Sequence, residues 1–201
     1  ICCKNSGSGG DQAFMGLGYF YNIVDLSLPG DSGAVIQKNT LLFNGPCIDY
    51  DHNRSLITGN VQYESLSAAI KKEPTCTTNA EYWLVIPACK DTFKAFLISD
   101  TGISAPVISV FPSEYFNRSW NVGGSAFSPN GRKFVIGLTY ANLYVTDNKY
   151  GLMLFDFDLN TGKLYNPKFL FPPTSTGGLF YTFAFSADNS KLYCSQLTGF
   201  G

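Results

Sequence analysis

Charged residues are scarce in this 201-residue chain, where they make up 14 % of the sequence and leave a formal net charge of −1. An average soluble domain carries roughly 25 % charged residues. Without a basic stripe the chain has nothing to attract a phosphate backbone, so no nucleic-acid partner is expected. Long apolar runs are also missing. None approaches the ~18 residues that a membrane-spanning helix needs, and we expect no membrane insertion.

Residue patterns for catalysis are missing as well. The chain has a single histidine, His52, and no Gly-x-Ser-x-Gly motif, which marks a hydrolase nucleophile. A serine or cysteine nucleophile depends on a nearby base, most often histidine. The glycine-rich segment 6–10 is not followed by the Lys-Ser/Thr pair of a phosphate-binding loop. We therefore predict no catalytic residue.

Aromatic residues and turn formers are abundant instead. The chain has 17 Phe, 12 Tyr, 20 Gly and 10 Pro. Aromatic residues favour strands, and glycine and proline favour turns. This composition predicts an all-β fold.

One short phrase occurs twice. "AFSPNGRKF" begins at Ala126, and "AFSADNSKL" begins 58 residues later, at Ala184. Each copy has the pattern of a strand, a tight polar turn and a second strand. Asn-Gly in the first copy and Asp-Asn-Ser in the second are residues that tolerate positive φ. We expect the same hairpin turn in both.

A second hairpin pattern occurs three times. Each copy has an alternating strand, a turn that ends in glycine and a shorter strand. The copies are segments 22–39, 95–108 and 154–167, with turn glycines Gly33, Gly102 and Gly162. Two hairpins in about 60 residues give roughly four strands, which is the content of one β-propeller blade.

These patterns predict a β-propeller of WD40/YVTN-like, four-stranded blades. A blade has two apolar faces, and copies bury them by packing face to face around an axis. We expect a flexible lead-in over residues 1–14 and a partial propeller of about three to four blades over residues 15–201. A closed ring has roughly four to eight blades. Further blades of a longer chain, or a second copy, are therefore expected partners.

Four segments resemble, in this order, the β-propeller region of large surface and secreted proteins of Bacteroidetes-type bacteria, which the type IX secretion system exports. They are "GYFYNIVDLSLPGDSGAVIQKNTLLF", "AEYWLVIPACKDTFKAFLISDTGISAPVIS", "AFSPNGRKFVIG" and "LMLFDFDLNTGKLYNP". The resemblance covers roughly residues 15–195. It implies an extracellular or outer cell-surface location and supplies no catalytic residue. The family commonly has histidines where this chain has Cys76 and Pro87, so no role of those histidines is carried over.

Asp156, Asp158 and Asn160 stand at alternate positions, as the first oxygen ligands of an EF-hand calcium loop do. That loop needs glycine at its sixth position and glutamate at its twelfth, and here these are Thr161 and Pro167. We favour a strand that ends in a turn and expect no cofactor, with calcium as the alternative.

Both tryptophans are candidates for stacking on a sugar or peptide at the propeller mouth. The competing interpretation, packing between blades, is favoured for Trp83 and less strongly for Trp120, which lies in a loop rich in Gly and Ser. Cys76 and Cys89 flank one strand and are candidates for a disulfide across a blade; the alternative is free thiols.

The sequence thus favours a non-catalytic secreted or cell-surface propeller, acting as a scaffold or as an adhesion-type module that binds a glycan or protein at its loop face. One alternative is a lactonase-like propeller hydrolase, which needs carboxylates or histidines converging on the central channel. The other is a structural subunit of a surface assembly.

Overall fold

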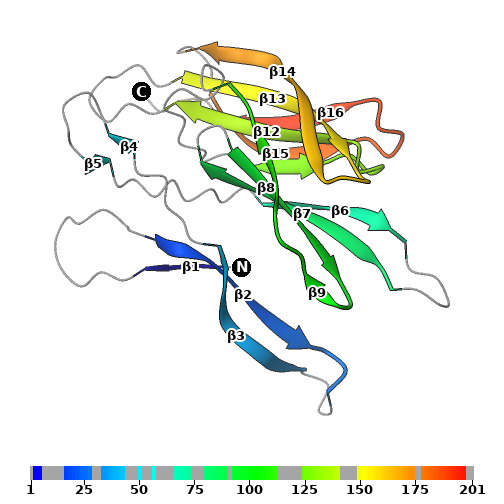
Figure 1. The fold of residues 1–201 in the computed structure, drawn as a ribbon. Helices are drawn as coiled ribbons and strands as arrows, with labels where there is room; N and C mark the ends of the chain where they lie inside the picture. Colours follow the sequence, from blue (N-terminus) through cyan, green and yellow to red (C-terminus); the bar gives the residue numbers. More distant parts are fainter. Residues whose placement is uncertain are drawn as a thin grey trace. The chain divides into compact units, whose positions relative to one another are not determined.

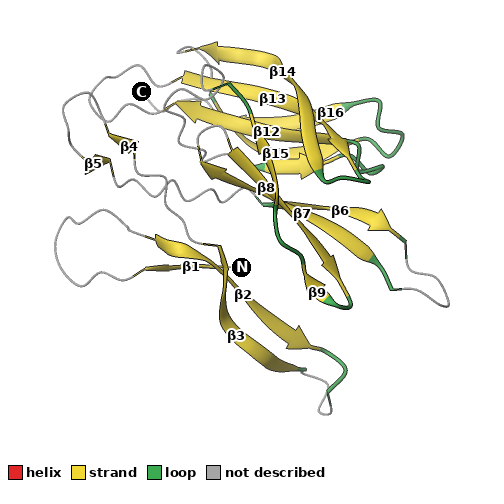
Figure 2. Ribbon diagram, viewed as in Figure 1, coloured by secondary structure: helices red, strands yellow, loops and turns green. Residues whose placement is uncertain are grey.

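The structure is a computed structural model. It describes residues 2–5, 16–28, 33–43, 49–50, 56–57, 66–73, 79–89, 92–112, 124–140, 149–174 and 178–197. Within these ranges the chain is all β, without a helix, and none of the several small antiparallel sheets is closed (Figure 2). No helix long and apolar enough to cross a membrane is found in this part of the chain. The chain divides into two compact units, residues 1–62 and 63–201, which we describe separately.

The first unit holds a three-stranded antiparallel sheet in the order β1-β2-β3 and a two-stranded sheet, β4-β5. The strands are β1 (Cys2–Asn5), β2 (Gly16–Asp25), β3 (Ala34–Phe43), β4 (Asp49–Tyr50) and β5 (Leu56–Ile57). β1 comes from the segment expected as a lead-in, and residues 6–14 of that segment lie outside the described ranges. The Asp25 carboxylate accepts the Ser27 amide at 2.8 Å and begins the turn between β2 and β3.

The second unit holds two larger sheets and a hairpin (Figure 1). The first sheet runs β10-β8-β7-β6, with β9 also paired to β8, and consists of β6 (Ser67–Lys72), β7 (Glu81–Cys89), β8 (Thr92–Ser99), β9 (Gly102–Ile103) and β10 (Val107–Val110). The second sheet runs β11-β12-β13-β14 and consists of β11 (Ser125–Phe127), β12 (Lys133–Tyr140), β13 (Lys149–Asp158) and β14 (Lys163–Thr174). The hairpin consists of β15 (Leu179–Phe185) and β16 (Leu192–Leu197). All pairings are antiparallel, between strands close together in sequence.

The repeated segments 126–134 and 184–192 both form the predicted turn. The Ser128 amide donates to the Lys133 carbonyl at 2.9 Å, and the Lys133 amide donates to the Ser128 hydroxyl at 2.9 Å. Turn 186–191 makes both bonds at the same distances. Positive φ falls at equivalent positions, 67° at Gly131 and 62° at Asn189. Side-chain chemistry within six residues therefore determines this local geometry.

The turn glycines of the second pattern adopt positive φ. The angles are 64° at Gly33, 118° at Gly102 and 74° at Gly162. Gly102 is the first residue of β9, which follows β8 after a tight turn, and Gly162 lies between β13 and β14. Positive φ is open to glycine at little cost, which explains its use where these strands reverse.

The main core lies between the first and second sheets. Because side chains alternate along a strand, one face of β12 and β13 points toward the first sheet. The Phe93 ring of the first sheet contacts Phe155 at 5.2 Å and Phe134 at 6.0 Å between ring centroids. The fully buried members of this core include Val85, Phe93, Phe134, Ile136, Leu138, Met153 and Phe155. The outer strands also meet, since the Leu164 amide donates to the buried Ser109 hydroxyl at 3.0 Å.

The opposite face of the second sheet packs on hairpin β15–β16. Val135 and Leu152 form a smaller buried cluster with Phe180. The backbones come close here, because the Gly124 amide donates to the Tyr181 carbonyl at 3.0 Å. The second sheet is thus covered on both faces.

Turn 186–191 gives a pH-dependent prediction. The Asp188 carboxylate accepts the Ser186 hydroxyl at 2.5 Å and the Ser190 amide at 3.1 Å, and these bonds lower its pKa from 3.8 to about 2. A lowered pKa in the folded state means that this stabilisation is present above pH 3.8 and is lost as the pH falls through about 2. An NMR titration of the Asp188 carboxyl carbon should give a midpoint near 2, and Ser186→Ala should move it toward 3.8. A midpoint near 3.8 in the unsubstituted protein would contradict the geometry of this turn.

Candidate binding site

A pocket of about 470 Å³ opens beside the turn between β13 and β14. Its volume falls in the range of small-molecule sites, roughly 300–1,000 Å³. Lys71 comes from β6 of the first sheet, and the other lining residues come from the second sheet and its turns. The pocket is lined by Lys71, Arg132, Lys133, Asp156, Phe157, Asp158, Leu159, Asn160 and Tyr165. The site therefore depends on how the two sheets pack.

Asp156, one of the candidate calcium ligands, is bound within the protein. Its Oδ1 forms an ion pair with Lys133, and its Oδ2 accepts the Asn166 amide group at 3.0 Å. The hydrogen bond from Lys133, followed by that from Asn166, holds the pKa of Asp156 below its ordinary value. Both oxygens of this carboxylate thus have donors from the chain itself.

Asp158 organises the turn that follows β13. Its Oδ2 accepts the Thr161 hydroxyl at 2.7 Å, and its Oδ1 accepts the Asn160 amide at 2.9 Å. These two bonds, the first being the larger cause, lower the pKa of Asp158. Among the described residues, no group of three or more His, Cys, Asp or Glu could hold a metal ion. This geometry favours the strand-and-turn interpretation over a calcium loop.

Calcium should leave the melting temperature unchanged. At about 10 mM Ca²⁺ a site with Kd about 1 mM would add ~1.4 kcal/mol of stability. For a chain of this size that corresponds to a rise of about 3–5 °C in Tm. Differential scanning fluorimetry with a CaCl₂ series, and a MgCl₂ series as the control for ionic strength, measures this. A saturable rise with calcium alone would restore the calcium interpretation.

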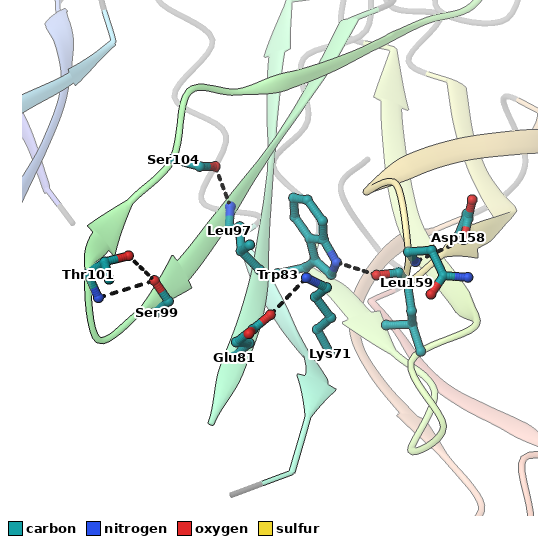
Figure 3. Close-up of polar contacts among 10 residues, drawn as sticks. Lys71, Glu81, Trp83, Leu97, Ser99, Thr101, Ser104, Asp158 and Leu159 are labelled. Atoms are coloured by element: carbon teal, nitrogen blue, oxygen red, sulfur yellow. Dashed lines mark hydrogen bonds and ion pairs between the residues drawn. The ribbon is translucent and has the colours of Figure 1, made fainter. Parts of the chain in front are cut away.

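Trp83 lies between the two sheets rather than at a surface (Figure 3). Its side chain is 4 % exposed, and its Nε1–H donates to the Leu159 carbonyl at 2.8 Å. Its ring meets the Phe157 ring edge-on at 6.2 Å. A Cβ at Gly162 would lie 2.6 Å from the indole, so glycine leaves the space that the ring fills. This placement agrees with the packing interpretation of Trp83, and a ring so buried has no face to offer a sugar.

Lys71 stands at the edge of the pocket next to this tryptophan. Its Nζ lies 2.8 Å from Glu81 Oε2 and 5.9 Å from the centroid of the Trp83 ring (Figure 3). The hydrogen bond from Lys71 is the main cause that lowers the pKa of Glu81. The charge of Lys71 is thus balanced by a neighbouring carboxylate.

Arg132 is one of several pocket residues, with Lys71, Lys133 and Tyr165, that were not predicted from the sequence. Its amide donates to Asn130 Oδ1 at 3.1 Å, and its carbonyl accepts the Phe157 amide at 2.9 Å. The backbone is therefore held on both sides, while the guanidinium makes no hydrogen bond or ion pair with any residue in the described ranges. The only sequence signal was the basic residue directly after the Asn-Gly turn, where the second copy has Ser190.

The remaining predicted site residues are not placed. Trp120 and Cys76 lie outside the described residues, and so does the side chain of Cys89, although its backbone ends β7. The Cys76–Cys89 disulfide and a stacking role for Trp120 therefore stay predictions. Comparison with known proteins adds no assignment: no protein-family model matches the chain, and no curated protein or solved structure matches it.

Proposed function

We propose that the chain is part of a β-propeller and works as a non-catalytic, secreted or cell-surface module that binds a glycan or a protein. The observation that carries the proposal is the succession of two four-stranded antiparallel paths, β6-β7-β8-β10 and β11-β12-β13-β14, followed by hairpin β15–β16. Successive blades of a propeller have this strand content and order.

Contacts between first strands support a common axis. The Ser67 hydroxyl in β6 and the Ser125 hydroxyl in β11 are 2.7 Å apart, and these residues are separated by 58 positions in the sequence. The amide of Gly124, directly before β11, donates to the Tyr181 carbonyl in β15. First strands of successive sheets thus lie side by side, which is the arrangement expected around a propeller axis.

Exposed apolar side chains on the outer elements are consistent with a larger ring. Phe171 in β14 is 53 % exposed although it stacks on Phe180, and Tyr193 in β16 is 59 % exposed. Further blades of a longer chain, or a second copy, would cover such surface. We include β2–β3 in the proposal, because Gly33 has positive φ beside a strand reversal, as Gly102 and Gly162 do.

A paired assay tests the binding function. The purified chain is applied to a glycan array and to a panel of extracellular-matrix proteins, and the same preparation is tested for lactone hydrolysis and metal content. We expect saturable binding to one class of glycan or protein and no turnover. Lactone turnover by a preparation that holds a stoichiometric metal ion would overturn the proposal in favour of a propeller hydrolase.

A further inference from the structure

We propose that the pocket around Arg132 binds the carboxylate of an acidic sugar. This inference rests on the proposed binding function and names the ligand class of one site. It follows from an imbalance between donors and acceptors in the pocket walls.

Both carboxylates of the pocket already accept hydrogen bonds from the chain. Asp156 is bonded by Lys133 and Asn166, and Asp158 is bonded by Asn160 and Thr161. The Arg132 donors are unused within the described residues. A guanidinium presents five N–H groups in a planar fork that matches the two oxygens of a carboxylate. An incoming carboxylate would therefore meet N–H donors that bond no described residue, whereas an incoming cation would compete with donors that the carboxylates already bind.

Two of the three cations in the walls are held in ion pairs. Lys133 is paired with Asp156, and Lys71 is paired with Glu81. Of the three cations that line the pocket, Arg132 is the one whose side chain bonds no described residue. The negative charge of Asp158 attracts the Arg132 guanidinium, but no hydrogen bond joins the two groups. Both Asp158 oxygens accept hydrogen bonds from the turn. The Arg132 guanidinium thus lines the pocket, and its N–H groups bond no described residue.

The other walls suit a sugar ring. Tyr165 is 46 % exposed and offers a ring face with a hydroxyl at its edge, and Leu159 adds apolar surface. Aromatic rings with a polar tip suit ligands that are apolar on one side and polar at their edges. Asn160 adds an amide group that can donate to and accept from sugar hydroxyls. A volume of about 470 Å³ is enough for a small ligand of this kind.

An NMR titration on the whole chain tests the proposal directly. The ¹⁵Nε–H signal of Arg132, assigned by its loss in Arg132→Lys, is followed while glucuronate, glucose or N-acetylglycine is added up to about 100 mM, where even weak binding is visible. We expect glucuronate to shift this signal with saturation and glucose to leave it unchanged. N-acetylglycine, a peptide-like carboxylate, should bind at least about tenfold more weakly because it cannot stack on Tyr165.

Three variants complete the test, with binding followed on the backbone amide signals of Asn160 and Tyr165, because the Arg132 side-chain signal is lost on substitution. Arg132→Gln should weaken glucuronate binding about tenfold or more, because a charge-assisted, two-pronged contact is lost. Arg132→Lys keeps the charge but lacks the fork, and should weaken it by a smaller factor. Lys191→Gln removes an exposed charge from turn 186–191, away from the pocket, and should leave glucuronate binding unchanged.

Several results would overturn the inference. They are the absence of a glucuronate shift, equal binding of glucose, equal binding of N-acetylglycine, or an Arg132→Gln variant that binds as the unsubstituted chain does. The glycan and protein arrays separate this failure from that of the proposed function. If Arg132→Gln retains its binding on the arrays, the module function stands and the ligand lies elsewhere; if the unsubstituted chain binds nothing on either assay, both proposals fail.

Discussion

Replacing Gly137 with alanine is expected to detach hairpin β15–β16 from the second sheet. A Cβ at this position would meet the Phe180 carbonyl oxygen far inside van der Waals contact. That carbonyl belongs to backbone that cannot move away freely, because the next carbonyl, of Tyr181, accepts the Gly124 amide at 3.0 Å. Overpacking typically costs about 1–3 kcal/mol, and a clash with fixed backbone lies at the upper end of this range. We expect a loss of this size in the free energy of unfolding.

Hydrogen exchange distinguishes detachment from general unfolding. In Gly137→Ala the amides of β15 and β16 should exchange faster, while those of β7, β8 and β13 stay protected. Gly102→Ala is the matched control, because its Cβ meets no atom within 4 Å and only the backbone strain of its positive φ remains. Unchanged exchange of β15 and β16 in Gly137→Ala would show that the close backbone contact does not exist.

Truncation of Trp83 to alanine should cost about 3–5 kcal/mol in the free energy of unfolding. The substitution leaves a cavity between the sheets and leaves the Leu159 carbonyl without its donor. Trp83→Phe keeps most of the apolar contact but loses the indole N–H, so a smaller cost of about 1–3 kcal/mol is expected. Urea denaturation followed by circular dichroism measures both. Equal and small costs for the two variants would mean that Trp83 does not join the sheets.

A double-mutant cycle tests the same contact from its other side. Gly162→Ala introduces a Cβ that would lie 2.6 Å from the indole, at a position where φ is 74°. In the Trp83→Ala background the clash is gone and only the φ strain is left. Gly162→Ala should therefore cost less there than in the unsubstituted chain, with a coupling of about 0.5–3 kcal/mol. Strictly additive costs would contradict the packing of the ring over the glycine.

The local turns could be predicted from sequence because their causes are local. Ser128 and Ser186 each bond the amide of the residue five positions later, and the glycine or asparagine between them takes positive φ. All of these groups lie within six residues, so their spacing can be recognised in the printed sequence. The alternating strands around the turns supply the period of two that predicts an all-β fold.

The site could not be predicted in the same way, because its parts come from distant segments. Trp83 is bonded to a carbonyl 76 positions away, and Lys71 reaches a pocket otherwise built by the second sheet. β6 carries no Ser-Pro-Asn-Gly turn, so nothing in "SAAIKK" marks it as a first strand. The sequence favoured a buried Trp83, but the carbonyl that its indole bonds and the unbonded guanidinium of Arg132 are consequences of sheet packing, which the sequence does not display.

Nuclear Overhauser effects between first strands test the central claim most directly. If successive four-stranded sheets share an axis, the β protons of Ser67 and Ser125 must give a cross-peak, since their hydroxyls are 2.7 Å apart. The Gly124 amide must likewise give cross-peaks to the backbone protons beside the Tyr181 carbonyl. We predict both sets in the intact chain. Regular cross-peaks within each sheet, but none from β6 to β11 or from β11 to β15, would contradict the account.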